Sequence, residues 1–166
     1  LSFVRSAEDF NIVRSKIKKL GYNVPVMAKI EKWEAVKSME KIIETFDAVM
    51  VARGDLGVEV PGEKVPIIQK KIIEKAGQAG KPAVIATQLL DSMIERPVPT
   101  RAEISDIANS ILDGADALMV TGETAIGNHP IKVIKVLIKV MNETESSIDY
   151  KNYFISKDHK ILNTAK

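Results

Sequence analysis

The chain has 166 residues, of which 45% are hydrophobic and 28% are charged, a composition typical of one soluble globular domain. The formal net charge of +2 is too small to indicate a nucleic acid partner, and no apolar run approaches the roughly 20 residues that cross a membrane. Cysteine is absent, which excludes disulfides, thiolate metal sites and cysteine nucleophiles and fits a cytoplasmic protein.

Strand and helix patterns alternate from the start of the chain. Residues 1–4 look like the end of a strand, and apolar residues at helical spacing predict a helix over 7–20 that Gly21 ends. A strand at 24–30 follows, and then a helix at 33–46 with an apolar stripe along one face. The first part of the chain is therefore predicted to consist of strand–helix units.

The segment 48–52 contains only small or apolar residues, which predicts a short strand buried on both faces. A loop with glycine and proline comes after it, and the next helix is expected to begin at Glu63 or Val65 and to end at Ala79. Another short apolar strand is predicted at 83–87.

The last third of the chain repeats the alternation. Two prolines keep the segment 95–99 irregular, and Thr100 with Glu103 forms a capping box that opens a helix. A strand at 117–120 and a long helix at 130–148 complete the pattern.

This order predicts an α/β fold with five parallel strands and helices outside the sheet. An open doubly wound sheet and a part of a TIM (β/α)₈ barrel both fit the spacing, and a full barrel needs about 250 residues. We expect residues 1–148 to form this partial domain and residues 149–166 to be a linker or the start of a following segment.

Polar side chains stand where each predicted strand ends, at the edge of the sheet that carries the site in both architectures. In chain order they are Ser2, then Lys29 and Glu31, then Arg53, Gly54 and Asp55, then Thr87 and Gln88, then Thr121, Gly122 and Glu123. Surface turns are also polar, so taken alone Gly54 and Asp55 fit either a turn or a site.

Lys29 and Glu31 are two residues apart on a strand, so their side chains share one face. They predict either an ion pair or a charged site. Glu31 and Asp55 follow neighbouring strands, roughly 4.8 Å apart, so both carboxylates can reach one cation. Two carboxylates with positions left for substrate and water are typical of Mg²⁺ or Mn²⁺ in phosphoryl-transfer enzymes.

Several stretches of the sequence resemble, in order, the motifs of pyruvate kinase. They are Lys29-Ile30-Glu31, the run from Met50 to Gly57 (MVARGDLG), the run from Ala86 to Met93 (ATQLLDSM), the run from Pro99 to Glu103 (PTRAE), the run from Asp113 to Ala117 (DGADA) and the run from Thr121 to Gly127 (TGETAIG). The resemblance extends from Ser2 to about Ile148.

The resemblance implies the fourth to eighth strands of the central (β/α)₈ barrel of this family. It implies an enzyme of glycolysis that transfers the phosphoryl group of phosphoenolpyruvate to ADP, giving pyruvate and ATP, with Mg²⁺ or Mn²⁺ and K⁺. The K⁺ ligands, an arginine for the phosphate and two further domains are expected outside this chain, in a homotetrameric parent.

The resemblance also assigns roles to residues. Lys29 resembles the lysine that stabilises the transferring phosphoryl group, and Glu31 and Asp55 resemble the metal ligands. Gly54, Asp55 and Thr87 resemble the contacts of the substrate carboxylate, with Thr87 also near the site of enolate protonation. Ser2, Arg53, Thr121 and Glu123 are supporting residues, and Thr121 departs from the serine that many relatives carry.

The chain is expected to be a fragment that is inactive alone and that self-associates through exposed sheet edges. Two alternatives remain. A metal-dependent aldolase or lyase barrel acting on pyruvate or oxaloacetate also pairs a strand-end Glu with an Asp on the next strand, but it does not need Lys29. A non-catalytic half-barrel is the other alternative.

Overall fold

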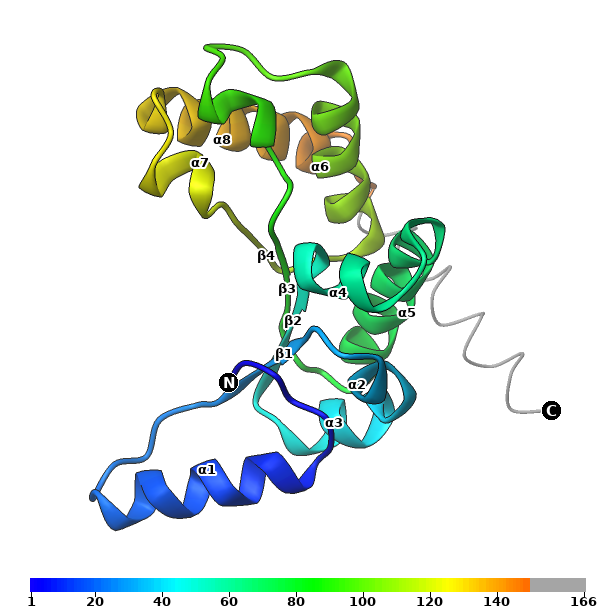
Figure 1. Cartoon of the computed structure of the whole chain (residues 1–166). Coiled ribbons are helices and arrows are strands. Elements are labelled where there is room, and N and C mark those ends of the chain that lie inside the picture. Colours follow the sequence, from blue (N-terminus) through cyan, green and yellow to red (C-terminus); the bar gives the residue numbers. More distant parts are fainter. Residues whose placement is uncertain (150–166) are drawn as a thin grey trace, which may run out of the picture.

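The computed structural model of the chain describes residues 1–149. It contains one parallel sheet of four strands, β1 (Met27–Ile30), β2 (Ala48–Ala52), β3 (Ala83–Ala86) and β4 (Ala117–Met119), whose order in the sheet is their order in the chain. Figure 1 shows the strands along the middle of the molecule, with α2 to α5 on one side of them, α1 below and α6 to α8 above. The predicted α/β fold with a parallel sheet is confirmed.

Helices connect the strands, as the alternation predicts. They are α1 (Glu8–Lys19), α2 (Trp33–Lys37), α3 (Met39–Thr45), α4 (Arg53–Glu59), α5 (Val65–Gln78), α6 (Arg101–Asp113), α7 (Gly122–Ala125) and α8 (Pro130–Ser146), with short 3₁₀ turns at η1 (Gly62–Lys64) and η2 (Asp91–Ile94). None of the helices in residues 1–149 has the length and apolar character needed to span a membrane. Most of the linker predicted at 149–166 lies outside the described residues.

The prediction of a strand at residues 1–4 is wrong. Leu1 does lie along the edge of β1, where Lys29 N–H donates to its carbonyl at 3.0 Å and its own amino group donates to the Met27 carbonyl at 2.7 Å. Phe3 then turns to a left-handed φ of 56°, which ends the extended path. Within residues 1–4, only Leu1 therefore has recorded backbone hydrogen bonds to β1.

The strand predicted at 24–30 begins only at Met27. Pro25 has no N–H to offer a neighbouring strand, and Val26 N–H donates at 2.6 Å to the Asp47 side chain. The Val24 carbonyl accepts from Arg14 at 2.8 Å. The Val26 carbonyl does accept from Asp47 N–H at 3.1 Å, but the other recorded bonds of residues 24–26 go to side chains, so the regular ladder with β2 begins at Met27.

Two further boundaries differ from the sequence prediction. The helix predicted over 33–46 is divided at Ser38, where ψ is 13°, into α2 and α3, and the bend lets Ala35, Val36, Ile42 and Ile43 all be buried. The loop predicted after β2 begins with α4, a helix that the fully buried Leu56 anchors to the core. Gly54 is therefore helical and does not have the positive φ of a tight turn.

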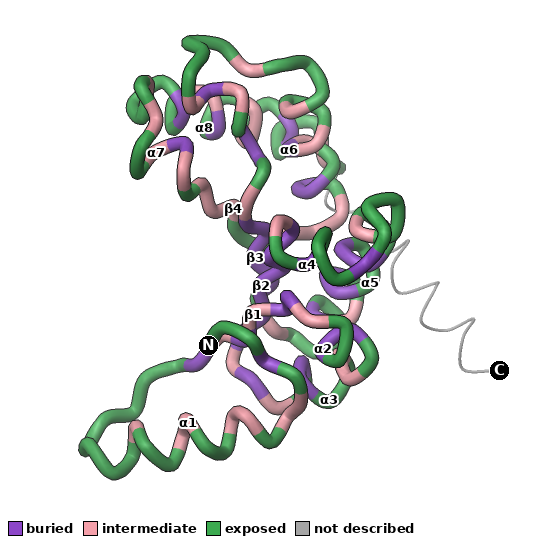
Figure 2. The backbone as a smooth tube through the Cα atoms, viewed as in Figure 1, coloured by how far each residue is buried: buried purple, intermediate pink, exposed green. Residues whose placement is uncertain are grey.

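The two faces of the sheet carry different cores. Ala28, Ile30, Val49, Val51 and Ile85 belong to the large cluster that packs under the helices. The opposite face carries a smaller cluster of Met50, Val84 and Ala86, against which Met27 and Met119 pack. Figure 2 shows the buried residues gathered along β2 and β3, and much exposed chain on α1 and α8. The strand β4 is an edge strand, and Ala117 in it is exposed.

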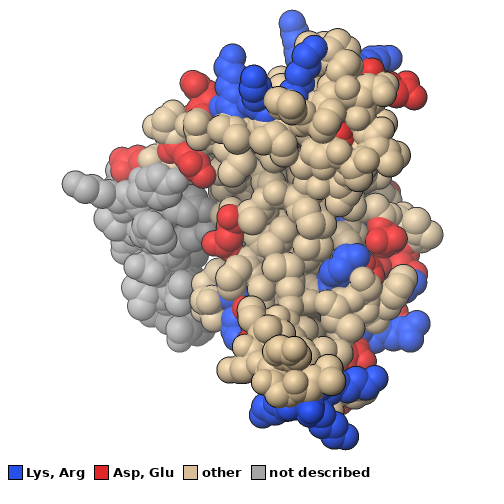
Figure 3. Space-filling view, turned by 90° about the vertical axis from the view of Figure 1, so that its left-hand side faces the viewer, with Lys and Arg blue, Asp and Glu red and all other residues tan. Residues whose placement is uncertain are grey.

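The face opposite the main helices is mostly uncharged. Figure 3 shows it with Lys and Arg side chains gathered at its two ends. The parallel register pairs Lys29 with Met50 and Met50 with Val84, so Lys29 lies on this face beside the smaller cluster. Lys29 therefore lies at the β1 edge of an otherwise apolar sheet face.

Candidate functional site

Lys29 and Glu31 form an ion pair at the exit of β1. The distance from Lys29 Nζ to Glu31 Oε1 is 2.5 Å, and Glu31 is 1% exposed whereas the Lys29 side chain is 31% exposed. The period of two along the strand places both side chains on one face, as the sequence predicts. A buried carboxylate is costly unless it is paired and hydrogen-bonded, and this one is both.

The backbone before α1 completes this group. Phe3 N–H donates to Glu31 Oε2 at 2.8 Å, and Lys29 Nζ donates to Ser2 Oγ at 3.3 Å. Phe3 has a left-handed φ of 56°, a conformation that costs about 1 to 3 kcal/mol for a residue with a side chain. Sequence reasoning missed Phe3, because nothing in its side chain indicates a role for its N–H.

Gly54 and Asp55 lie in the first turn of α4, directly after β2. Gly54 N–H donates to Thr87 Oγ1 at 2.8 Å, so the exits of β2 and β3 are joined at this point. A Cβ on Gly54 would lie 3.4 Å from Thr87 Oγ1, which explains the glycine by close approach. The Asp55 side chain is exposed and makes no hydrogen bond or ion pair recorded within the described residues.

Thr87 and Gln88 follow β3 in consecutive left-handed conformations, with φ of 68° and 56°. Left-handed φ is especially unfavourable for a β-branched residue such as threonine. Arg53 is 7% exposed and crosses from the end of β2 to bond both carbonyls of this pair. Asp106 on α6 accepts from Arg53 Nη1 at 2.6 Å. The sequence offers no signal for Asp106, since α6 has several polar residues.

Glu123 belongs to a separate buried group after β4. It is 1% exposed, accepts from Leu90 N–H at 3.2 Å and accepts from Thr121 N–H at 2.8 Å. Thr121 and Glu123 thus tie the start of α7 to the segment before η2. No recorded contact joins them to Lys29, Glu31 or Asp55 within residues 1–149.

The donor chemistry of Glu31 and Asp55 suits a hard divalent cation such as Mg²⁺. No cluster of three or more His, Cys, Asp or Glu side chains that could hold a metal occurs in the described part of the chain. Two carboxylates fit an ion that takes its other ligands from substrate and water, as Mg²⁺ commonly does. Both oxygens of Glu31 already have a partner, Lys29 Nζ on Oε1 and Phe3 N–H on Oε2, so Glu31 would share one of them with the ion.

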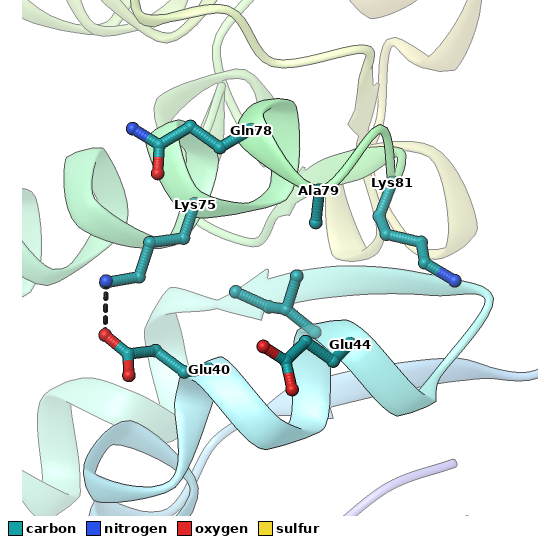
Figure 4. Close-up of a pocket in the computed structure, with 7 residues that line it drawn as sticks. Glu40, Glu44, Lys75, Gln78, Ala79 and Lys81 are labelled. Carbon is teal, nitrogen blue, oxygen red and sulfur yellow. Dashed lines mark hydrogen bonds and ion pairs between the residues drawn. The ribbon is translucent and has the colours of Figure 1, made fainter. Parts of the chain in front are cut away.

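A cavity and a groove lie among the helices, and only the cavity is lined by predicted site residues. A cavity of about 560 Å³ is lined by Arg53, Gly54, Gln69, Gln88 and Asp106 among others, and so lies behind the strand exits. A groove of about 520 Å³ lies between α3 and α5, where Lys75 pairs with Glu40 (Figure 4). The groove contains none of the predicted site residues.

Comparison with known proteins shows which family the chain resembles. The family model described as pyruvate kinase, barrel domain, matches residues 1–134. The pyruvate kinase of Thermotoga maritima is 54% identical over 150 residues, which are 90% of this chain and 32% of that protein. That of Mycobacterium tuberculosis is 52% identical over 147 residues, 89% of this chain and 31% of that protein.

A solved structure agrees with these relatives. The crystal structure of a pyruvate kinase from Cryptosporidium parvum matches with a TM-score of 0.92 and 41% identity, over 96% of this chain and 34% of that one. Together with the parallel sheet, this match supports the prediction of a partial TIM barrel. The chain spans about a third of the length of the relatives it matches. The comparisons do not favour the aldolase, lyase or non-catalytic alternatives.

Proposed function

This chain belongs to the pyruvate kinase family, and on that basis we propose that it supplies one wall of a site that transfers a phosphoryl group from phosphoenolpyruvate to ADP, giving pyruvate and ATP. The observation that carries the proposal is the Lys29–Glu31 ion pair. Its carboxylate is only 1% exposed, and the pair lies at the edge of an otherwise apolar sheet face. A buried ion pair adds little net stability to a fold, and this favours a role for the pair in the reaction.

Lys29 stabilises the phosphoryl group as it transfers. The P–O bond to the enolate oxygen breaks and a new P–O bond forms to a terminal oxygen of ADP, while charge spreads over the equatorial oxygens. A compact ammonium on a flexible stem suits this task. The partial exposure of Lys29 allows its Nζ to exchange Glu31 for a phosphoryl oxygen.

Glu31 and Asp55 hold Mg²⁺ or Mn²⁺ in this proposal, and the ion neutralises charge on the phosphoryl and enolate oxygens when it is bound. Phe3 N–H fixes the Glu31 carboxylate from the opposite side. The K⁺ ligands lie outside this chain, and the parent is a cytoplasmic homotetramer in the same proposal.

Gly54, Asp55 and Thr87 bind and orient the substrate. The backbone N–H groups at the start of α4 meet the substrate carboxylate, and Thr87 Oγ1, which accepts from Gly54 N–H at 2.8 Å, is held beside that position. Thr87 then lies beside the enolate carbon that takes a proton to give pyruvate. The open sheet, with β4 as an edge, leaves the site unenclosed, so little turnover is expected of the 166-residue chain alone.

A chimera tests the proposal. The 150 residues that match replace their counterparts in the Thermotoga maritima enzyme, and pyruvate formation is followed with a coupled lactate dehydrogenase assay. We expect the chimera to be active and Lys29→Met to lower kcat by about 10² to 10³-fold, the usual effect of losing one preorganised electrostatic group. A folded Lys29→Met chimera with full kcat would refute the role of Lys29, and near-full turnover by the chain alone would refute the expected inactivity.

A further inference from the structure

Thr87 and Gln88 form a strained pair that needs an external support. Their φ values of 68° and 56° are both left-handed, and neither residue is glycine. Two such residues in succession are unfavourable and persist only where neighbouring groups hold them. The pair begins directly after β3 ends at Ala86, so β3 itself provides no ladder partner beyond that residue.

Arg53 provides the support. Its Nε and Nη2 both donate to the Thr87 carbonyl, at 3.1 and 2.8 Å, and Nη2 also donates to the Gln88 carbonyl at 2.8 Å. Only a guanidinium presents several donors in one rigid plane, so lysine cannot reproduce this arrangement. Arg53 can bond both carbonyls only while they point toward it, and a right-handed backbone at Thr87 and Gln88 would point them in other directions.

The guanidinium is fixed from its other side. Asp106 Oδ2 accepts from Nη1 at 2.6 Å, and Gln69 Oε1 lies 3.5 Å from the same nitrogen. Arg53 is 7% exposed, so its charge requires such a partner. The cavity of about 560 Å³ beside these residues gives Gln88 space to relax if the support is lost.

We propose that Arg53 is a positioning residue of the site: it holds the Thr87–Gln88 backbone left-handed and thereby places the Thr87 hydroxyl on Gly54 N–H. Asp106 orients Arg53 for this task. Arg53 touches neither substrate nor metal in this scheme. The inference deepens the proposed function and rests on it only for its effect on turnover, because the backbone geometry is measurable in the chain itself.

Amide hydrogen exchange of Gly54 in the 166-residue chain reports where the Thr87 hydroxyl lies. We expect Arg53→Lys to speed this exchange by about tenfold, the effect of losing one hydrogen bond. Adding Gln88→Gly should return most of the protection, since glycine adopts positive φ without strain. A purely structural role for Arg53 would not be rescued by a glycine at this position.

Arg14→Lys is the matched control. Arg14 also pairs with an aspartate, Asp47, at 2.6 Å and donates to a carbonyl, that of Val24, at 2.8 Å, but near the opposite ends of the strands. The Arg14→Lys variant should leave the hydrogen exchange of the Gly54 amide unchanged relative to that of the remaining amides. If Arg53→Lys does not fold, Asp106→Asn replaces it and should speed Gly54 exchange in the same direction.

Unchanged Gly54 exchange in Arg53→Lys, or in Asp106→Asn when it serves as the substitute, overturns the inference, as does a lack of rescue by Gln88→Gly. In the chimera, Arg53→Lys should lower kcat more than it changes the KM for phosphoenolpyruvate, and Gln88→Gly should restore kcat. A chimera that is inactive with Arg53 present would refute the proposed function, whereas the exchange result would still decide the role of Arg53.

Discussion

Lys29 Nζ lies 2.5 Å from Glu31 Oε1, and of the two side chains only that of lysine reaches solvent. The carboxylate has one other recorded partner, Phe3 N–H. The pair therefore couples the end of β1 to the segment before α1 through a buried negative charge. This coupling has consequences for stability that can be measured without substrate.

Removal of Lys29 should reveal how strongly its charge stabilises the buried Glu31 carboxylate. We expect Lys29→Met to lower the free energy of unfolding by about 1 to 3 kcal/mol, because Glu31 then remains buried without its cation. Adding Glu31→Gln should recover part of that loss. Urea unfolding of the two single variants and the double variant measures it, and strictly additive losses would contradict the coupling. Arg5→Met, whose pair with Glu34 is exposed on both sides, is the control and should cost less than about 1 kcal/mol.

Divalent metal binding should depend on both strand-exit carboxylates. In a Mn²⁺ titration followed by NMR, we expect the backbone signals around Glu31 and Asp55 to broaden first. Asp55→Asn should weaken binding by at least about tenfold, the smaller effect seen when even a supporting group is lost at a metal site. Glu63→Gln, an exposed carboxylate on η1, should change nothing. Broadening centred on the groove at Glu40 and Glu44 would argue against the assignment.

Because Phe3 has a left-handed φ, we expect a glycine at this position to be tolerated. Phe3 is 62% exposed, and its ring centroid lies 5.5 Å from Lys32 Nζ, so Phe3→Gly removes backbone strain, this one contact and little packing. We expect the free energy of unfolding to change by about 0 to +1 kcal/mol, since the entropy that glycine adds to the unfolded chain offsets part of the relief. Tyr22→Gly, at a similarly exposed residue without positive φ, should lose about 0.5 to 1 kcal/mol. Equal losses in thermal unfolding would show that Phe3 is not strained.

The capping box of α6 should make stability depend on pH. Burial opposes ionisation of Glu103, but hydrogen bonds from Ser92 and Thr100 outweigh it and lower the pKa of Glu103 below 4.5. The folded state therefore binds fewer protons, so this contribution is present above pH 4.5 and is lost as the pH falls through the lower folded value.

Glu103→Gln should flatten that part of the pH profile, and Thr100→Ala should cost about 1 kcal/mol at neutral pH. Unfolding by urea at several pH values provides the measurement. An unchanged slope below pH 4.5 in Glu103→Gln would mean that other carboxyl groups carry the dependence.

Exposed apolar residues on α8 predict self-association of the chain. On α8, Ile131, Ile134 and Ile138 are 71%, 40% and 49% exposed, and they lie three and four residues apart on one face. Light scattering should show an apparent mass that rises with protein concentration, and Ile134→Lys should make this rise smaller. Ile67→Lys on α5, where the isoleucine is 55% exposed, serves as the comparison. A monodisperse monomer at all concentrations would contradict the prediction.

The sequence by itself determined the parallel α/β fold, because short apolar strands and amphipathic helices alternate with a clear change of period. It also placed Lys29 and Glu31 on one face, since side chains alternate along a strand, and left open whether they form an ion pair or a charged site. The capping box at Thr100 and Glu103 was equally predictable from local spacing. These features depend on residues only a few positions apart.

Only the tertiary structure decided which backbone groups meet across strands. The left-handed conformations of Phe3, Thr87 and Gln88 carry no local signal, because none of them is a residue that favours positive φ. The same holds for Arg53, whose partners Thr87 and Asp106 lie 34 and 53 residues away in the chain. Long-range hydrogen bonds hold these conformations against their local cost, so their geometry cannot be deduced from neighbouring residues.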